Sequence, residues 1–171
     1  MSIKLNNVRL SFPSLFQKAQ FNGEETKYEA TFLLDKVKHA AVIKEIEAAI
    51  AQKTASDLKG AKIPASKLCL RDGDEVEYDG YAGHMTIKAS TKKRPLVVNK
   101  DKSPLTEADG VVYSGCYVNA IIDLWAQDNN YGKRINATLL GVQFAADGEA
   151  FSSGGSGASV DDFDDLDGEA F

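Results

Sequence analysis

Apolar and polar residues alternate along several stretches of this chain, which is the pattern of β-strands with one buried face. The predicted strands cover residues 5–12, 27–34, 83–91, 111–126 and 134–144, and residues 96–98 form a short apolar run. The segment between the last two strands, residues 127–132, contains Asp, Asn and Gly. Because these residues favour a tight turn, the two strands are predicted to form one long hairpin.

The alternation also predicts which side chains of a strand point to the core. The apolar positions of the first strand are Leu5, Val8, Leu10 and Phe12. In the strand at 111–126, the predicted core face carries Ser114, Cys116, Val118, Ala120, Ile122 and Leu124. The opposite face carries Tyr113, Tyr117, Asn119, Ile121, Asp123 and Trp125. We expect the first of these two faces to be buried and the second to be available for other contacts.

One segment has helical periodicity. In residues 37–53 the apolar residues recur at intervals of three and four, at Val42, Ile43, Ile46, Ala49 and Ile50. This spacing predicts an amphipathic helix, and Asp35 is placed to cap its N-terminus. Residues 54–80 contain Gly, Pro and Asp-Gly breakers and are predicted to be irregular.

These elements predict a mainly β protein with one principal helix, inserted after the second strand. An OB-fold-like, five-stranded Greek-key barrel fits this order. A β-sandwich with an inserted helix is the alternative that the pattern leaves open.

The composition changes after Phe144. Residues 152–159 are only Ser, Gly and Ala, which is typical of a flexible linker. Residues 160–171 are acidic and too poor in apolar side chains to form a core, so they are predicted to be disordered. We therefore divide the chain into a globular domain, residues 1–146, and a linker with an acidic tail, residues 147–171.

The charge is divided in the same way. The whole chain has a net charge of −5, with 25 acidic and 20 basic residues. Eight of the acidic residues and none of the basic ones lie in residues 147–171. The domain is thus about +3 and the tail −8, so the overall acidity does not exclude a nucleic-acid partner.

The densest group of basic and aromatic residues lies between residues 78 and 94. It comprises Tyr78, Tyr81, His84, Lys88, Lys92, Lys93 and Arg94. Basic side chains along an alternating strand can follow a phosphate backbone, and aromatic rings can stack on unpaired bases. The alternative is that this row is only the solvated face of an edge strand.

The predicted hairpin carries a second such group. Trp125 lies near the end of one strand, Tyr131 in the turn, and Lys133 and Arg134 at the start of the next strand. OB-folds use the corresponding loop to bind oligonucleotides. Trp125 could instead belong to the core or to a dimer interface, and Asp123 on the same face would repel phosphate.

The C-terminal residues combine acids with spaced apolar side chains, which a simple solubility tail does not need. The segment contains Asp161, Asp162, Phe163, Asp164, Asp165, Leu166, Asp167 and the terminal Phe171. Such a peptide can dock on a basic and apolar pocket of a partner protein, or compete with DNA for the basic groove of its own domain.

Other functional classes find little support in the sequence. The chain lacks the phosphate-loop, nucleophile-elbow, zinc-protease and dinucleotide-binding motifs, so we predict no enzyme, no cofactor and no metal. The acids of residues 72–75 could suit Mg²⁺ or Ca²⁺, but a polar turn explains them better. Cys69 and Cys116 match no zinc spacing and are predicted to be reduced thiols. No signal peptide or membrane span is visible, which predicts a protein of the bacterial cytoplasm with no membrane contact.

Four stretches resemble a known family. They are SIKLNNVRLSFPSLF, GDEVEYDGYAGHMTIKASTKKRP, YSGCYVNAIIDLWAQDNNYGKRINATLLGVQF and the final DDFDDL. Together they resemble a phage-encoded family of single-stranded DNA-binding proteins, formerly a domain of unknown function. The resemblance implies an OB-fold, a role in phage DNA replication, recombination or repair, an acidic C-terminal tail and a homodimer.

The sequence therefore predicts a protein that binds and protects single-stranded DNA without reading its sequence. The predicted DNA-binding residues are Tyr78, Tyr81, Lys88, Lys92, Lys93, Arg94, Trp125, Tyr131, Lys133 and Arg134. The acidic tail is predicted to recruit replication or recombination proteins and to restrain DNA binding. A phage structural or assembly protein is the alternative, and a metal-dependent nuclease is a weaker one.

Overall fold

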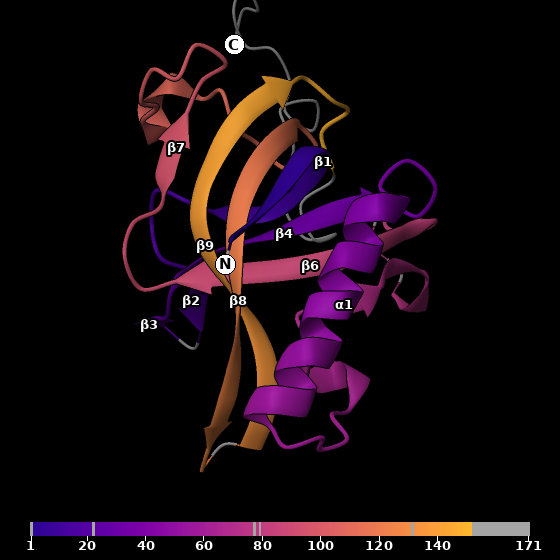
Figure 1. Cartoon of the computed structure of the whole chain (residues 1–171). Helices are drawn as coiled ribbons and strands as arrows, with labels where there is room; N and C mark the ends of the chain where they lie inside the picture. Colours follow the sequence, from indigo (N-terminus) through magenta and orange to yellow (C-terminus); the bar gives the residue numbers. More distant parts are fainter. Residues whose placement is uncertain (1, 22, 77, 79, 131, 152–171) are drawn as a thin grey trace, which may run out of the picture.

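Five strands close into a barrel. The computed structural model describes residues 2–151 except residues 22, 77, 79 and 131. The barrel strands are β1 (Ser2–Ser14), β4 (Tyr28–Asp35), β6 (His84–Thr91), β8 (Tyr117–Asn129) and β9 (Gly132–Ala146). They follow the order β6-β4-β1-β8-β9 with antiparallel neighbours. A parallel pairing of Ser90 with Thr138 joins β6 to β9 and completes the ring (Figure 1). The OB-fold-like barrel is thereby confirmed.

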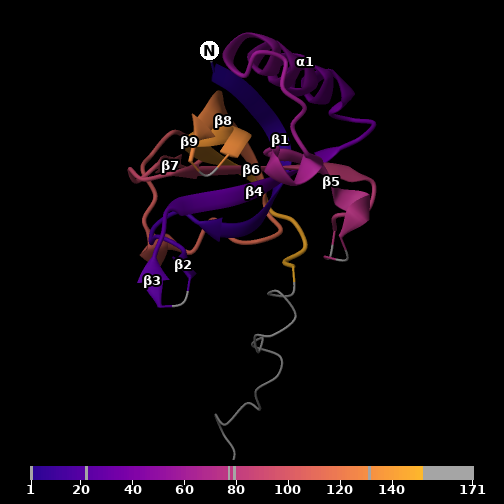
Figure 2. The ribbon, with the colours of Figure 1, turned by 90° about the horizontal axis from the view of Figure 1, so that it is seen from below.

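The smaller elements surround this barrel. They are β2 (Gln20–Phe21), β3 (Glu24–Glu25), β5 (Leu70–Asp72), β7 (Leu96–Val98), η1 (Ala65–Lys67), η2 (Gly73–Glu75) and η3 (Glu107–Asp109). β5 pairs with β6, and β7 runs parallel to β9 at the other end of the sheet. The β2–β3 hairpin and the helix lie on opposite sides of the barrel (Figure 2).

The core consists of the side chains that the barrel strands point inward. Leu5, Leu10, Phe32, Ile87 and Ile122 are all fully buried, and removing their apolar surface from water is the main favourable contribution to folding. On β8 the alternation is as predicted, because Val118, Ala120, Ile122 and Leu124 are buried. Cys116, just before the strand, is buried as well. Ser114 was predicted to face the core but is only half-buried, because it lies outside the strand, in the turn that precedes β8.

The helix α1 spans Ala40–Asp57 and covers one side of the β8–β9 hairpin (Figure 1). Ile43 and Ile46 are buried, and the other predicted apolar positions pack against the same core. Its start differs from the prediction, since the Asp35 carboxylate accepts the N–H groups of Val37 and Lys38 at 2.9 Å. Asp35 therefore caps a turn that precedes the helix. Within the described residues, no helix is long and apolar enough to cross a membrane.

Two further segments differ from the sequence prediction. β8 begins at Tyr117 rather than at residue 111, because the N–H of Cys116 donates to Tyr113 O and forms a turn there. Residues 54–80 are not entirely irregular, since they contain β5 and two short 3-10 turns. β5 has only three residues, and that is too short for alternation to reveal it.

The packed part of the chain continues past the predicted domain boundary at residue 146. The Tyr113 hydroxyl lies 2.9 Å from Asp147 Oδ1, and the N–H of Phe151 donates to Ser114 O at 3.0 Å. Residues 147–151 are therefore held against the barrel.

Candidate nucleic-acid interface

A groove of about 1060 Å³ runs over the outer face of β4 and β6. The segment from η1 to β5 borders it on one side together with the β8–β9 hairpin, and Phe12, Val76 and Tyr78 border the other end. Thr31 on β4 and Lys88 on β6 are register partners in its floor. The groove thus exists only because strands distant in sequence are adjacent in the barrel.

Three aromatic side chains form a cluster at one end of the groove. The Phe12 and Tyr78 rings meet edge to face with their centroids 5.3 Å apart, and Tyr78 and Tyr81 do so at 5.2 Å. Phe12 is 43% exposed and Tyr78 52%, whereas Tyr81 is 5% exposed. The Tyr81 hydroxyl lies 2.8 Å from the buried Ser11 Oγ, and burial raises the pKa of this phenol. The buried Tyr81 ring therefore supports the exposed Tyr78 ring, which in turn contacts Phe12.

Phe12 reaches the groove through a β-bulge. We predicted it as the last inward-facing residue of the first strand, but the pairing of β1 with β4 shifts by one residue between Ser11 and Ser14. Phe12 has a φ of 48° at this point. Because an inserted residue re-aims the side chains of a strand, Phe12 faces out. Alternation alone cannot locate such a bulge.

The β8–β9 hairpin supplies a second aromatic position. Trp125 lines the groove and is 40% exposed. It pairs across the strands with Asn136, and Gln127 pairs with Arg134. The amide of Asn136 donates to Gln127 Oε1 at 2.9 Å. These four side chains form one continuous polar and aromatic surface along the hairpin.

The groove carries a mixture of charges in which basic side chains are the majority. Its basic members are Lys27, Lys67, Arg71, Lys88 and Arg134, and its acidic members are Glu29, Asp72 and Glu75. Lys88 Nζ lies 3.1 Å from Glu29 Oε2, and Lys36 Nζ lies 2.8 Å from Asp72 Oδ1. Two of the three acids are thus partly neutralised, so the groove is suited to an anion.

A family model for the single-stranded DNA-binding protein of Enterobacter phage Enc34 matches residues 1–170 of this chain. The chain belongs to that family. Two solved structures of the bacteriophage Enc34 protein are similar to it. The structure in complex with single-stranded DNA has 36% identity and a TM-score of 0.79, covering 88% of this chain and 89% of that chain. The second structure of the Enc34 protein has 35% identity and a TM-score of 0.81, covering 95% of this chain and 90% of that chain.

A relative from another phage is more similar in sequence. Protein p50 of Acyrthosiphon pisum secondary endosymbiont phage 1 is 48% identical over 176 residues, covering 97% of this chain and 94% of that protein. The predicted resemblance to a phage-encoded single-stranded DNA-binding family is therefore confirmed.

The structure of this Enc34-family chain brings five of the predicted site residues together. Tyr78, Tyr81, Lys88, Trp125 and Arg134 line the groove. The others that are described lie outside its lining. These are Lys92, Lys93 and Arg94, all exposed after β6, and Lys133, exposed on β9. Tyr131 and the predicted tail residues, Asp161 to Phe171, lie outside the described residues.

Four aromatic or basic residues of the groove were not among the predicted ones. Phe12 was hidden by the bulge. Lys27 begins the predicted strand at residues 27–34, and Lys67 and Arg71 come from the segment that was predicted to be irregular. The Arg71 guanidinium donates to the carbonyl oxygens of Ser66 and Leu68. No local sequence signal distinguishes these cations from ordinary surface residues.

Both cysteines are free, as predicted. Cys69 lines the groove, and burial raises the pKa of its thiol to about 11. Burial also raises the pKa of Cys116. Both side chains are therefore protonated at neutral pH and serve as small apolar residues.

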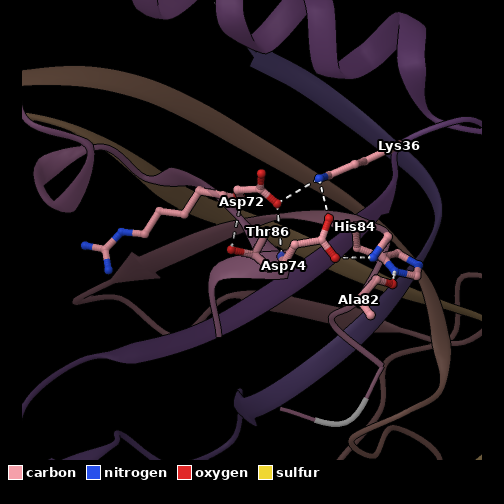
Figure 3. A network of polar contacts seen from close by, with 8 residues as sticks. Lys36, Asp72, Asp74, Ala82, His84 and Thr86 are labelled. Atoms are coloured by element: carbon pink, nitrogen blue, oxygen red, sulfur yellow. Dashed lines mark hydrogen bonds and ion pairs between the residues drawn. The ribbon is translucent and has the colours of Figure 1, made fainter. Parts of the chain in front are cut away.

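An ion-pair network connects the end of β4 with β5 and η2 (Figure 3). Lys36 Nζ lies 2.8 Å from Asp72 Oδ1 and 2.6 Å from Asp74 Oδ2. Asp74 Oδ1 in turn accepts the N–H of Gly83 at 2.8 Å. The network therefore fastens the segment 73–83 near both of its ends. The anchor is Lys36, which directly follows β4.

This network predicts a pH-dependent contribution to stability. The hydrogen bonds from Lys36 are the largest cause that lowers the pKa of Asp72 and Asp74 below 3.8. Because a lowered pKa stabilises the fold above the unfolded value, the contribution is present above pH 3.8 and is lost as the pH falls through the folded values. Lys36→Met should lower the Tm at pH 7, and the difference from the wild type should shrink below about pH 4. A Tm difference that is constant from pH 7 to pH 3, or one that Lys44→Met reproduces, would contradict this role.

Proposed function

We propose that this chain binds single-stranded DNA without reading its sequence, and protects it during phage DNA replication, recombination or repair. The groove carries this proposal, because exposed aromatic rings at both of its ends are separated by a floor with basic side chains. The bacteriophage Enc34 relative with single-stranded DNA in its structure supports the same ligand.

The aromatic residues stack on bases. Phe12, Tyr78 and Trp125 each expose about half of their surface, and each stacked base contributes about 1–3 kcal/mol to binding. Duplex DNA keeps its bases paired and cannot supply this energy, so an extended single strand is the favoured ligand. Tyr81 acts as a positioning residue for Tyr78, since its own ring is buried.

Basic side chains hold the phosphates. Lys88 and Arg134 lie within the groove, and Lys27 and Lys67 lie at its borders. We assign Lys92, Lys93, Arg94 and Lys133 to contacts with DNA that continues beyond the groove. The first three are exposed just after β6, and Lys133 is exposed at the start of β9. Tyr131, which lies between β8 and β9 in the sequence, is proposed as a further stacking position.

The acidic tail has a regulatory role in this proposal. Residues 161–171 recruit replication or recombination proteins and compete with DNA for the basic groove. The contrast between the −8 tail and the +3 domain supports an attraction between them. The homodimer and the location in the bacterial cytoplasm stay predictions.

Fluorescence anisotropy tests the proposed function. We expect labelled oligo-dT to bind more tightly than a matched duplex. The affinity for RNA of the same length measures how far binding depends on the sugar. Truncation after Phe151 keeps every described residue and should tighten oligo-dT binding, because the competing acids are removed. Equal affinity of the full-length and truncated proteins for oligo-dT would contradict the competition by the tail, but it would not contradict binding in the groove.

Failure of both proteins to bind any of the three nucleic acids would contradict the proposed function. The second candidate, a structural or assembly protein of a phage, would then be preferred. The same result would leave the barrel fold unaffected, because the fold does not depend on the ligand.

A further inference from the structure

A pentapeptide occurs twice in this chain. Residues 147–151 and residues 167–171 both read Asp-Gly-Glu-Ala-Phe. The first copy, residues 147–151, is packed on the barrel. The second copy, residues 167–171, lies outside the described residues. We call the surface under the first copy the Arg9 dock, which is formed by Arg9, Gly80, Tyr113, Ser114, Gly115 and Tyr117.

The Arg9 dock binds the first half of the pentapeptide through one tyrosine. The Tyr113 hydroxyl lies 2.9 Å from Asp147 Oδ1 and 3.0 Å from Gly148 O, so it can donate to either oxygen. It accepts the N–H of Gly148 at 3.1 Å. Burial and the neighbouring Asp147 carboxylate both raise the pKa of Tyr113, which keeps the hydroxyl protonated as a donor.

Arg9 binds the second half. Its Nη2 donates to Glu149 O at 2.5 Å, and its Nε donates to Gly115 O at 3.0 Å. The guanidinium carbon lies 4.1 Å from the centroid of the Phe151 ring, within the range of a cation–π contact. The N–H of Phe151 completes the site by donating to Ser114 O at 3.0 Å.

The fit selects the residues of the pentapeptide. A Cβ atom at Gly148 would lie 2.2 Å from Gly115 O and 3.0 Å from the Tyr117 ring, so no larger residue fits there without a shift. The Phe151 ring lies so close to Gly80 that a Cβ atom at that position would be 2.4 Å from it. Asp, Gly and Phe at positions one, two and five are thus read by the dock, and all three are the same in the second copy.

We propose that the Arg9 dock accepts either copy of the pentapeptide, so that residues 167–171 of the same chain replace residues 147–151 there. An identical peptide offers the dock identical side chains. The second copy is connected through residues 147–166, a 20-residue segment that includes the Gly/Ser run, and such a tether provides a millimolar effective concentration. The same peptide of a second molecule, at micromolar concentration, competes poorly with the tethered peptide.

The first copy predominates in the wild-type chain. It follows β9 directly, whereas docking of the second copy must close a longer loop and lose the corresponding entropy. Weakening the first copy should therefore reveal the second. This exchange requires no DNA, so it is tested independently of the proposed function.

A double-mutant cycle in the full-length protein tests the exchange. Phe171→Ala alone should leave the Tm unchanged. In the Phe151→Ala background, Phe171→Ala should lower the Tm by about 2–4 °C, because the second copy has then become the ligand. Absence of any effect of Phe171→Ala in the Phe151→Ala background would overturn the proposal.

Two controls separate the pentapeptide from general properties of the tail. Phe163→Ala, also in the tail but outside the repeat, should have no effect in the Phe151→Ala background, and an equal fall in Tm would overturn the specificity. A synthetic Asp-Gly-Glu-Ala-Phe peptide should raise the Tm of the Phe151→Ala/Phe171→Ala variant, whereas Asp-Ala-Glu-Ala-Phe should not. A Tm that rises more steeply with protein concentration for the Phe151→Ala variant than for the Phe151→Ala/Phe171→Ala variant would overturn the assignment to the same chain, because a dimer alone affects both variants equally.

Discussion

Replacement of Trp125 by Ala should weaken the binding of oligo-dT by about 5- to 150-fold, which corresponds to the 1–3 kcal/mol of one base stack. Trp125 is 40% exposed and borders the groove, so its ring is available to a base. Trp125→Phe should retain most of the affinity, because it keeps a flat aromatic face. Trp125 is the only Trp of the chain, and its fluorescence should therefore be quenched as DNA binds to the wild type.

The matched control for this variant is Leu140→Ala. Leu140 is 45% exposed, similar to Trp125, but it is not among the groove residues. Its removal should leave the dissociation constant within about twofold, since it contributes no stack. If Leu140→Ala weakened binding as much as Trp125→Ala, the loss would reflect general destabilisation of the hairpin. The proposed stacking role of Trp125 would then be wrong.

The double variant Lys88→Ala/Arg134→Ala should weaken oligo-dT binding by about 30-fold at low salt. We take about 1 kcal/mol for each phosphate contact, because both side chains are partly exposed. The variant should also reduce the slope of log K against log salt by about 1.4, which is 0.7 for each contact with a single strand. Removal of Lys88 leaves the Glu29 carboxylate without its 3.1 Å partner, which adds repulsion of the phosphate.

The control for charge is Lys44→Ala/Lys59→Ala. Both residues are exposed, and neither lines the groove, so this variant changes the net charge equally without touching the proposed path. We expect its salt slope to equal that of the wild type. An equal loss of slope in both double variants would show that binding depends on overall charge rather than on the groove.

The residues that the sequence identified correctly are those whose position follows from local alternation. Ile122 and Leu124 face the core and Trp125 faces outward on β8, because successive side chains of a strand point to opposite sides. The helix was visible for the same reason, from the spacing of Ile43, Ile46 and Ile50. Trp125 and Arg134 could be assigned to one site because a hairpin places its two strands side by side.

The residues that the sequence missed depend on contacts between distant segments. Lys67 and Arg71 border the groove only because the chain after α1 returns to β6 and to β9. Tyr81 was predicted to stack on a base, but the Ser11 hydroxyl beneath it holds the ring in the interior. Neither relation leaves a trace in the local pattern of apolar and polar residues.

The end of the domain was also hidden from the sequence. Composition changes after Phe144, so residues 147–151 look like the start of a linker. Their contacts with Arg9 and Tyr113 cross more than 30 positions of the chain. Truncation experiments on the tail should therefore begin after Phe151, because removal of these five residues would empty the Arg9 dock as well.

Photo-crosslinking tests most directly whether the groove is where DNA binds. An oligo-dT that carries 5-iodouracil is irradiated with the full-length protein, and mass spectrometry locates the modified residues. The groove predicts adducts at Phe12, Tyr78 and Trp125. Adducts confined to aromatic residues outside the groove, such as Tyr28 or Tyr117, would contradict the central claim and place the nucleic acid on another face of the barrel.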